Sequence, residues 1–242
     1  MKNKHICITG GSSGIGLFMV NFFLNLNFKV TCISKSRPKI YSKNFEAIKC
    51  DLSNLNLIKL KLKKLKKKID CLINNAGDLG EIGPLSKINF NKWKKSFDLN
   101  LFSHVLITKQ LQKNLKKNKS IVIFISGGGS ASPFPNFSAY SLAKTCLVRL
   151  TENLHLENKN FKYYIIAPGA NNTKLLRKSI KFGHKVDKKK IVSSELAAKL
   201  CLFLLKTQPN TLNGKFIHVK DDYKKLKKIN KELFTLRRVE TT

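Results

Sequence analysis

The chain has 242 residues, 42% of them apolar, and a formal net charge of +33 at pH 7. This length and apolar content suffice for one sizeable core, and no change in composition marks a second domain, so we expect residues 1–242 to form a single domain. No apolar run approaches about 20 residues, which argues against a membrane span. A strand predicted from residue 5 leaves no room for a cleavable presequence, so we expect a soluble, cytoplasmic protein.

The positive charge does not by itself indicate a nucleic-acid partner. Lys greatly outnumbers Arg, and Asn, Ile and Phe are abundant, which is the composition that an adenine- and thymine-rich genome would produce. In the lysine-rich run 59–68, apolar residues recur at helical spacing, so the lysines form the solvated face of a helix. Six cysteines without C-x-x-C spacing predict buried thiols in a reducing compartment. We expect no specific nucleic-acid partner, no metal site and no disulfide framework.

Apolar strand-like runs alternate with helical patterns along the chain. Strands are predicted at 5–9, 29–33, 45–50, 71–74, 120–126, 161–167 and 215–219. Helices are predicted at 15–26, 55–67, 90–116, 138–156 and 194–205. This alternation predicts an α/β fold, a Rossmann-like doubly wound parallel sheet of about seven strands with helices on both faces.

A glycine-rich turn joins the first predicted strand to the first helix. The segment Gly10-Gly-Ser-Ser-Gly-Ile-Gly16 leads directly into the helical run. Gly10, Gly14 and Gly16 permit positive φ and close approach of the backbone, and the N–H groups of the new helix face any anion bound there. The spacing G-x-x-x-G-x-G differs from the commoner dinucleotide pattern G-x-G-x-x-G. Taken alone, the segment also fits a simple tight connection.

Polar residues follow two later strands, at the edge where open α/β sheets bind ligands. The fourth predicted strand runs into Asn74-Asn-Ala-Gly77, and the fifth ends at Ser126. The next predicted helix carries Tyr140 and Lys144 one turn apart on the same face. An ammonium beside a phenol favours phenolate, so this spacing predicts a lowered pKa for Tyr140 and proton transfer near neutrality. The same pair also arises by chance in lysine-rich helices.

Together these motifs resemble the short-chain dehydrogenase/reductase family, over roughly residues 5 to 220. The similarity is carried by Thr9-Gly-x-x-x-Gly-x-Gly16, Asn74-Asn-Ala-Gly77, Asn100 within Asp98-Leu-Asn-Leu, Tyr140-x-x-x-Lys144 and Pro168-Gly169. Five motifs in this order are far more specific than any one of them. The resemblance implies an enzyme that transfers a hydride between a nicotinamide cofactor and a carbonyl or secondary alcohol of a small molecule.

The resemblance assigns four residues to the reaction, namely Tyr140, Lys144, Ser126 and Asn100. Tyr140 is expected to exchange a proton with the substrate oxygen, and Lys144 to bind the nicotinamide ribose and favour the phenolate. Asn100 is expected to hold a water that links Lys144 to solvent. The family places its orienting serine thirteen residues before the tyrosine, but position 127 is Gly here. We assign Ser126 to this role, with Ser130 as the alternative.

The same resemblance implies a set of cofactor contacts. These are Gly10, Ser12, Ser13, Gly14, Ile15 and Gly16 at the pyrophosphate, Asp51 and Leu52 at the adenine, Asn75, Ala76 and Gly77 at the adenosine ribose, Tyr140 and Lys144, and Pro168, Gly169, Asn171 and Thr173 at the nicotinamide carboxamide. For Asp51, a helix N-cap is the alternative. In this fold an acidic residue closing the second strand repels a 2′-phosphate, whereas Ser34 stands there, followed by Lys35 and Arg37. The pocket thus offers cations and no carboxylate, and we predict NADP(H) over NAD(H).

Two segments are specific to this chain. Residues 170–193 lie where the family carries its mobile substrate lid, and eight of the seventeen residues from 174 to 190 are Lys or Arg. This density favours an acidic, phosphorylated or sugar-linked substrate. After the last strand, residues 220–242 form a polar extension where many relatives end with Gly-Gly. The extension either packs against a neighbouring subunit, covers the site or forms a solvated helix.

Two alternative functions and an assembly also follow from the resemblance. One alternative is a 3-oxoacyl-carrier-protein reductase, and the other is an NADP(H)-binding regulator that has lost catalysis. The family commonly forms homotetramers or homodimers through the long helices predicted here at 90–116 and 138–156, and we expect the same assembly.

Overall fold

The computed structural model describes residues 4–226, and its centre is a seven-stranded parallel sheet. Along the sheet the strands are β3 (Phe45–Lys49), β2 (Lys29–Ser34), β1 (His5–Thr9), β4 (Cys71–Asn74), β5 (Ile121–Ile125), β6 (Lys162–Ala167) and β7 (Phe216–His218). Ile8 of β1 lies opposite Cys32 of β2 on one side and Ile73 of β4 on the other. The strand order reverses between β1 and β4, so ligands are expected at the carboxyl ends of these two strands. The predicted fold class is confirmed.

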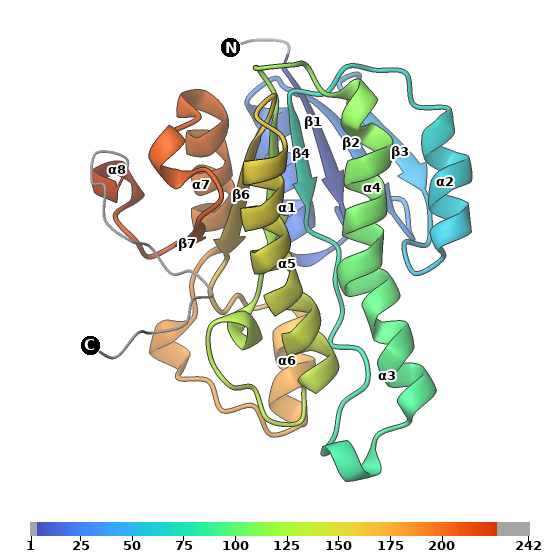
Figure 1. Ribbon diagram of the computed structural model, residues 1–242, viewed down its shortest axis with the longest axis vertical. Helices are drawn as coiled ribbons and strands as arrows, with labels where there is room; N and C mark the ends of the chain where they lie inside the picture. The colour runs from blue at the N-terminus through green and yellow to red at the C-terminus, as the bar shows by residue number, and fades with distance from the viewer. Residues whose placement is uncertain (1–3, 227–242) are drawn as a thin grey trace.

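Helices cover both faces of this sheet and create two separate cores (Figure 1). One face carries α1 (Gly14–Asn25) and α7 (Ser194–Thr207), and the other carries α2 (Leu55–Lys63), α4 (Ser103–Leu111) and α5 (Ser138–Glu157). Along β1, Ile6 and Ile8 enter the core under α1 whereas Cys7 enters the opposite core, because successive side chains of a strand alternate between faces. A strand covered on both faces needs apolar residues throughout, which explains the continuous apolar run in the sequence.

The long helix predicted at 90–116 runs without a gap from residue 90 to residue 114, but its hydrogen bonding changes along its length. The structure divides it into α3 (Phe90–Phe97), a π-helical turn (Asp98–Phe102), α4 and a 3-10 turn (Gln112–Asn114). Inside the π-helical turn, Asn100 Nδ2 donates to the carbonyl oxygen of Ser96 at 2.9 Å, so a side chain takes up a carbonyl of the preceding helix. Such turns are rare and recur at functional sites. The apolar periodicity on either side continues across the turn, which is why the sequence predicted one helix.

The segment expected to be an irregular lid contains α6 (Lys174–Lys181), which lies below the carboxyl ends of the strands in Figure 1. Thr173 begins this helix, since its Oγ1 accepts a hydrogen bond from the Leu176 N–H at 3.3 Å. The remaining 3-10 turns span Leu85–Lys87, Gly128–Ser130, Lys188–Lys190 and Asn210–Leu212.

The predicted extension at 220–242 is described only as far as α8 (Tyr223–Leu226). The ring of Tyr223 packs against Phe203 of α7, with ring centroids 4.9 Å apart. The start of the extension therefore packs on its own subunit, and the predictions for residues 227–242 lie outside the described residues.

Candidate active site

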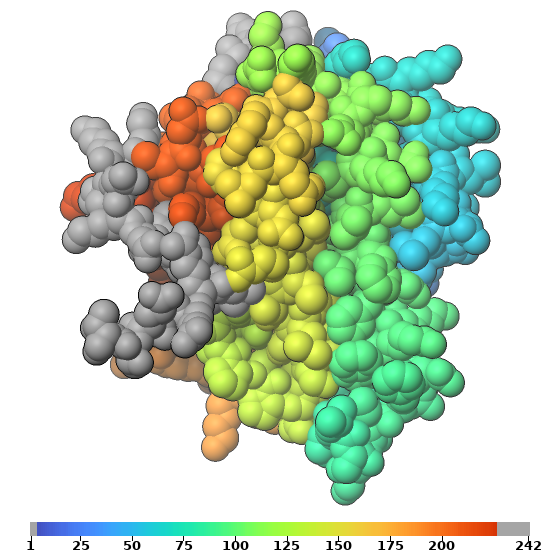
Figure 2. Space-filling view, viewed as in Figure 1, coloured from blue at the N-terminus to red at the C-terminus, as the bar shows by residue number. Residues whose placement is uncertain are grey.

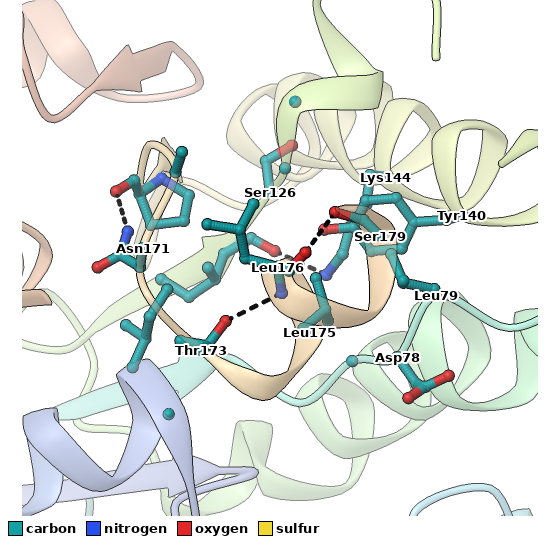
Figure 3. Close-up of a pocket in the computed structure, with 18 of the residues that line it drawn as sticks. Asp78, Leu79, Ser126, Tyr140, Lys144, Asn171, Thr173, Leu175, Leu176 and Ser179 are labelled. Carbon is teal, nitrogen blue, oxygen red and sulfur yellow. Dashed lines mark hydrogen bonds between the residues drawn. The ribbon is translucent and has the colours of Figure 1, made fainter. Parts of the chain in front are cut away.

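A cavity of about 1570 Å³ opens at the carboxyl ends of the strands. Its walls come from the β1–α1 turn, the residues that follow β2, β4, β5 and β6, and the α6 segment (Figure 3). The predicted residues that line it are Gly10, Ser12, Ser13, Gly14, Ile15, Gly16, Ser34, Lys35, Asp51, Leu52, Asn75, Ala76, Gly77, Ser126, Tyr140, Lys144, Pro168, Gly169, Asn171 and Thr173. Two predicted residues do not line it: Arg37 is exposed elsewhere, and Asn100 is buried behind Gly77.

The β1–α1 turn is shaped for close approach of a ligand to the backbone. Gly10 and Gly14 have φ values of 68° and 54°, and a Cβ on Gly10 would lie 2.7 Å from Ala76 Cα. A Cβ on Gly16 would overlap the carbonyl oxygen of Gly10. The first turn of α1 contains no acidic residue, and Ser13 makes no side-chain cap hydrogen bond. The first N–H groups of α1 are thus available to an anion, and the turn fits the pyrophosphate of a dinucleotide.

Thr9 joins the glycine turn to the loop after β4. Its Oγ1 accepts hydrogen bonds from the N–H groups of Asn75 at 2.9 Å and Ala76 at 3.0 Å. In return, Asn75 Nδ2 donates to the carbonyl oxygen of Thr9 at 2.9 Å. Two motifs that are far apart in the sequence thereby form one wall of the cavity.

Lys35 and Asp51 form an ion pair at the cavity edge, with 2.9 Å between Nζ and Oδ2. Asp51 Oδ1 also accepts from the N–H and hydroxyl of Ser53, and the bond from Lys35 is the largest cause that lowers the pKa of Asp51 to about 2. Asp51 is not a helix cap, because Asn54 caps α2. The expectation of a pocket with cations and no carboxylate is therefore wrong, because the Asp51 carboxylate lies at the same edge of the cavity and pairs with Lys35.

Tyr140 and Lys144 lie together and are almost completely buried. Lys144 Nζ is 5.8 Å from the centroid of the Tyr140 ring and donates to the carbonyl oxygen of Ile125 at 2.9 Å. Burial raises the pKa of Tyr140 to about 12, with the negative charge of Asp78 as a second cause, and burial lowers the pKa of Lys144 to about 8. The predicted lowering of the Tyr140 pKa is wrong for this arrangement, because both causes of its shift, burial and the charge of Asp78, raise the pKa.

The residues that bury Tyr140 come from several separate segments. Leu79 and Phe137 form a small apolar cluster with it, and Phe134, Ile82 and Leu175 pack against that cluster. Figure 3 shows Leu175 and Leu176 of α6 around the same pocket as Tyr140 and Ser126. An ion pair also ties α6 to the loop after β4, with 3.2 Å between Lys178 Nζ and Asp78 Oδ1.

Two buried serines follow β5. Their hydroxyl oxygens, on Ser126 and Ser130, are 2.7 Å apart, and Ser130 donates to the carbonyl oxygen of Gly127 at 2.7 Å. Because a hydroxyl carries one proton, Ser126 is the donor in the contact between the two. Ser126 lines the cavity and Ser130 does not. Gly127 stands against the phenol, and a Cβ there would overlap the Tyr140 hydroxyl oxygen. A serine at position 127 would therefore displace Tyr140.

Asn100 lies behind the cavity wall, next to Gly77. Its Oδ1 accepts from the Asp78 N–H at 3.1 Å. A Cβ on Gly77 would lie 3.1 Å from Asn100 Oδ1 and 3.4 Å from Lys144 Nζ, so the absence of a side chain at Gly77 lets both groups approach one point. By contrast, Asn171 turns away from a ligand, because its Nδ2 donates to the carbonyl oxygens of Pro168 and Gly169.

The model of the short chain dehydrogenase family matches residues 4–182. The chain belongs to this family. An uncharacterised oxidoreductase of Schizosaccharomyces pombe is 31% identical over 179 residues, which cover 70% of this chain and 72% of the relative. The 3-oxoacyl-[acyl-carrier-protein] reductase of Buchnera aphidicola is 29% identical over 242 residues, which cover 89% of this chain and 95% of the relative. A crystal structure of the 3-ketoacyl-(acyl-carrier-protein) reductase of Brucella melitensis, complexed with NADH, matches with a TM-score of 0.79 at 22% identity, covering 90% of this chain and 97% of that one.

As a short-chain dehydrogenase, the protein is an oxidoreductase with a fold that binds NAD(P)(H). Between residues 4 and 226, no cluster of His, Cys, Asp or Glu has the arrangement of a metal site. The helices within that range are also too short or too polar to cross a membrane.

The sequence-based interpretation of this short-chain dehydrogenase missed His104. Its side chain is completely buried on α4, and Nε2 lies 2.9 Å from the carbonyl oxygen of Ala76, so Nε2 carries the proton and donates. Burial, with the charge of Lys144 as a second cause, lowers the pKa of His104 from 6.5 to about 3. His104 thus positions the loop after β4. In the sequence, His104 follows Asn100 by four residues, and this helical spacing is the signal that could have indicated its place near the site.

His104 is expected to make the enzyme less stable in acid. Its folded pKa lies below its unfolded pKa, so below pH 6.5 the unfolded chain binds a proton that the folded chain excludes, and stability is lost as the pH falls toward 3. Between pH 6.5 and 5 the loss is about 2 kcal/mol. Urea denaturation at both pH values should show this loss reduced in His104→Gln, which keeps a donor for Ala76. An identical loss in both proteins would contradict the assignment.

Proposed function

We propose that this short-chain dehydrogenase is an NADP(H)-dependent oxidoreductase that interconverts a carbonyl group and a secondary alcohol. The main support is that Tyr140, Lys144 and Ser126 line the same cavity as the glycine turn at the start of α1. A bound nicotinamide supplies or accepts the hydride of this reaction. The glycine turn, Asp51, the loop after β4, and Lys144 would hold the cofactor.

The chain's own residues handle the proton and the substrate oxygen. At pH 7 the phenol of Tyr140 is protonated, because burial raises its pKa to about 12, and it can give this proton to a carbonyl oxygen that is being reduced. Ser126 orients that oxygen once its hydroxyl proton, which is donated to Ser130 Oγ at 2.7 Å in this structure, turns toward it. Because burial lowers its pKa to about 8, Lys144 gives up a proton more readily than an exposed lysine. Asn100 would hold the relay water that returns this proton from solvent.

The preference for NADP(H) rests on Lys35 and on the lack of an acidic side chain at Ser34. The Lys35 side chain is 81% exposed, so it can contact a 2′-phosphate while it remains close to Asp51. We expect kcat/KM with NADPH to exceed kcat/KM with NADH by about tenfold or more. Lys35→Ala should lower this ratio by about tenfold. Lys39→Ala is the matched control, because Lys39 is exposed and does not line the cavity. A preference for NADH would contradict the proposal.

The cations of the α6 segment support an acidic, phosphorylated or sugar-linked substrate. Lys174, Arg177, Lys185 and Lys190 line the outer part of the cavity. Comparing kcat/KM for anionic and neutral carbonyl compounds tests whether the substrate is acidic. Equal efficiency on both would contradict an acidic substrate. The Buchnera aphidicola relative favours 3-oxoacyl-carrier-protein reduction as the alternative. A regulator that has lost catalysis would bind NADPH but would not oxidise it with any carbonyl compound.

We also propose a homodimer or homotetramer in the cytoplasm. Figure 2 shows the face on which α4 and α5 lie side by side. Val105 of α4 and Leu142 of α5 are apolar side chains that are exposed to solvent. A partner subunit on this face would bury them. All six cysteines are free thiols, which fits a reducing compartment.

A further inference from the structure

His184 lines the cavity beside the proposed proton donor and has no role in the reaction described above. It lies between α6 and the 3-10 turn that follows. Its ring meets the edge of Phe134, with centroids 4.5 Å apart, and Phe134 also meets the ring of Tyr140 at 6.3 Å. Phe134 therefore connects His184 to Tyr140 through one aromatic surface, which Leu79 and Leu175 extend.

Hydrogen bonds decide which nitrogen of His184 carries the proton. Ser179 is buried, and its hydroxyl donates to the carbonyl oxygen of Leu176 at 2.8 Å. Since that hydroxyl has no second proton, His184 Nδ1 must be the donor in its 3.0 Å contact with Ser179 Oγ. The backbone N–H of His184 also donates to the Ser179 carbonyl oxygen at 3.0 Å, so the ring is held from two directions.

The other ring nitrogen of His184 is left as an acceptor. Burial lowers the pKa of His184 below its ordinary value of 6.5, so the ring is neutral at pH 7. With the proton on Nδ1, Nε2 carries a lone pair, and it makes no hydrogen bond to any residue from 4 to 226. A half-buried acceptor on the wall of a cavity favours a ligand that brings a donor.

We infer that His184 determines substrate specificity by accepting, at Nε2, a hydrogen bond from a hydroxyl group of a planar, apolar carbonyl compound that packs against Phe134. The inference rests on the proposed function and names its substrate class. The cations of the α6 segment that line the cavity are exposed whereas His184 and Phe134 are half-buried, so an anionic group elsewhere on the substrate is compatible with this contact.

The test compares matched ligands in binding rather than in turnover. The three hydroxyacetophenones and the corresponding methoxyacetophenones are titrated calorimetrically into the enzyme loaded with NADP⁺. At least one hydroxy compound should bind about tenfold more tightly than its methoxy counterpart, because the methoxy group has no proton to donate. In His184→Phe, which keeps an aromatic ring beside Phe134, the ratio should fall to near one. His184→Gln, whose amide oxygen accepts, should keep part of it.

Equal binding of each pair by the unaltered enzyme would overturn the inference, as would the absence of any binding or a preference that survives in His184→Phe. Thermal melting of both variants identifies any general loss of structure. Because binding is measured apart from NADPH oxidation, failure of the proposed reaction is distinguishable. An enzyme that binds the hydroxyketone through His184 but never reduces a carbonyl would support this contact and contradict the reaction.

Discussion

Tyr140→Phe is expected to lower kcat by about 10³-fold while cofactor binding stays intact. The substitution removes one oxygen and leaves the ring in its apolar cluster with Leu79 and Phe137, so the shape of the cavity is preserved. What is lost is the proton donor for the substrate oxygen. Lys144 does not occupy the place of the lost hydroxyl, because its Nζ is held 2.9 Å from the Ile125 carbonyl oxygen.

NADPH oxidation with a reducible carbonyl compound measures this effect, and quenching of protein fluorescence measures NADPH affinity in the same samples. Tyr164→Phe is the matched control, since it removes a buried hydroxyl that donates to the Pro209 carbonyl oxygen, away from the cavity. The control should lose about 1 kcal/mol of stability and little activity. Turnover by Tyr140→Phe at the level of the unaltered enzyme would exclude the phenol as the proton donor.

Gly127→Ala should lower kcat by about 10²-fold, whereas Gly128→Ala, one residue along the same loop, should remain close to the unaltered enzyme. A Cβ on Gly127 would overlap the Tyr140 hydroxyl oxygen and lie 2.9 Å from Cζ, so the whole phenol must shift. A Cβ on Gly128 would have no atom within 4 Å. Neither glycine has positive φ, so backbone strain does not separate the two variants.

Steady-state kinetics together with thermal melting test this pair. Melting temperatures close to that of the unaltered enzyme, combined with a large kcat defect in Gly127→Ala alone, would support displacement of Tyr140. Equal activity of the two variants would show that the phenol position seen here is not required.

Local sequence patterns sufficed for the sheet and for most of the cavity. The runs at 5–9 and 71–74 coincide with β1 and β4 because a strand covered on both faces must be apolar along its whole length. The Gly10–Gly16 turn and Tyr140 were recognisable because each depends on spacing within a few residues. The π-helical turn at Asn100 was not, since it changes the hydrogen bonding and leaves the apolar pattern intact.

By itself, the sequence determined the order of the elements, the edge of the sheet that binds ligands and the family. Only the tertiary structure decided the electrostatics of the site, because burial and ion pairs depend on residues that are distant along the chain. Tyr140 is acidified by its neighbour in a helix viewed alone, yet Leu79 and Leu175 bury it and reverse the shift. The sequence pattern predicts that Lys35 faces a ligand, yet Asp51, which follows the neighbouring strand, pairs with it. Such through-space contacts carry no local periodicity, and the fold alone brings them together.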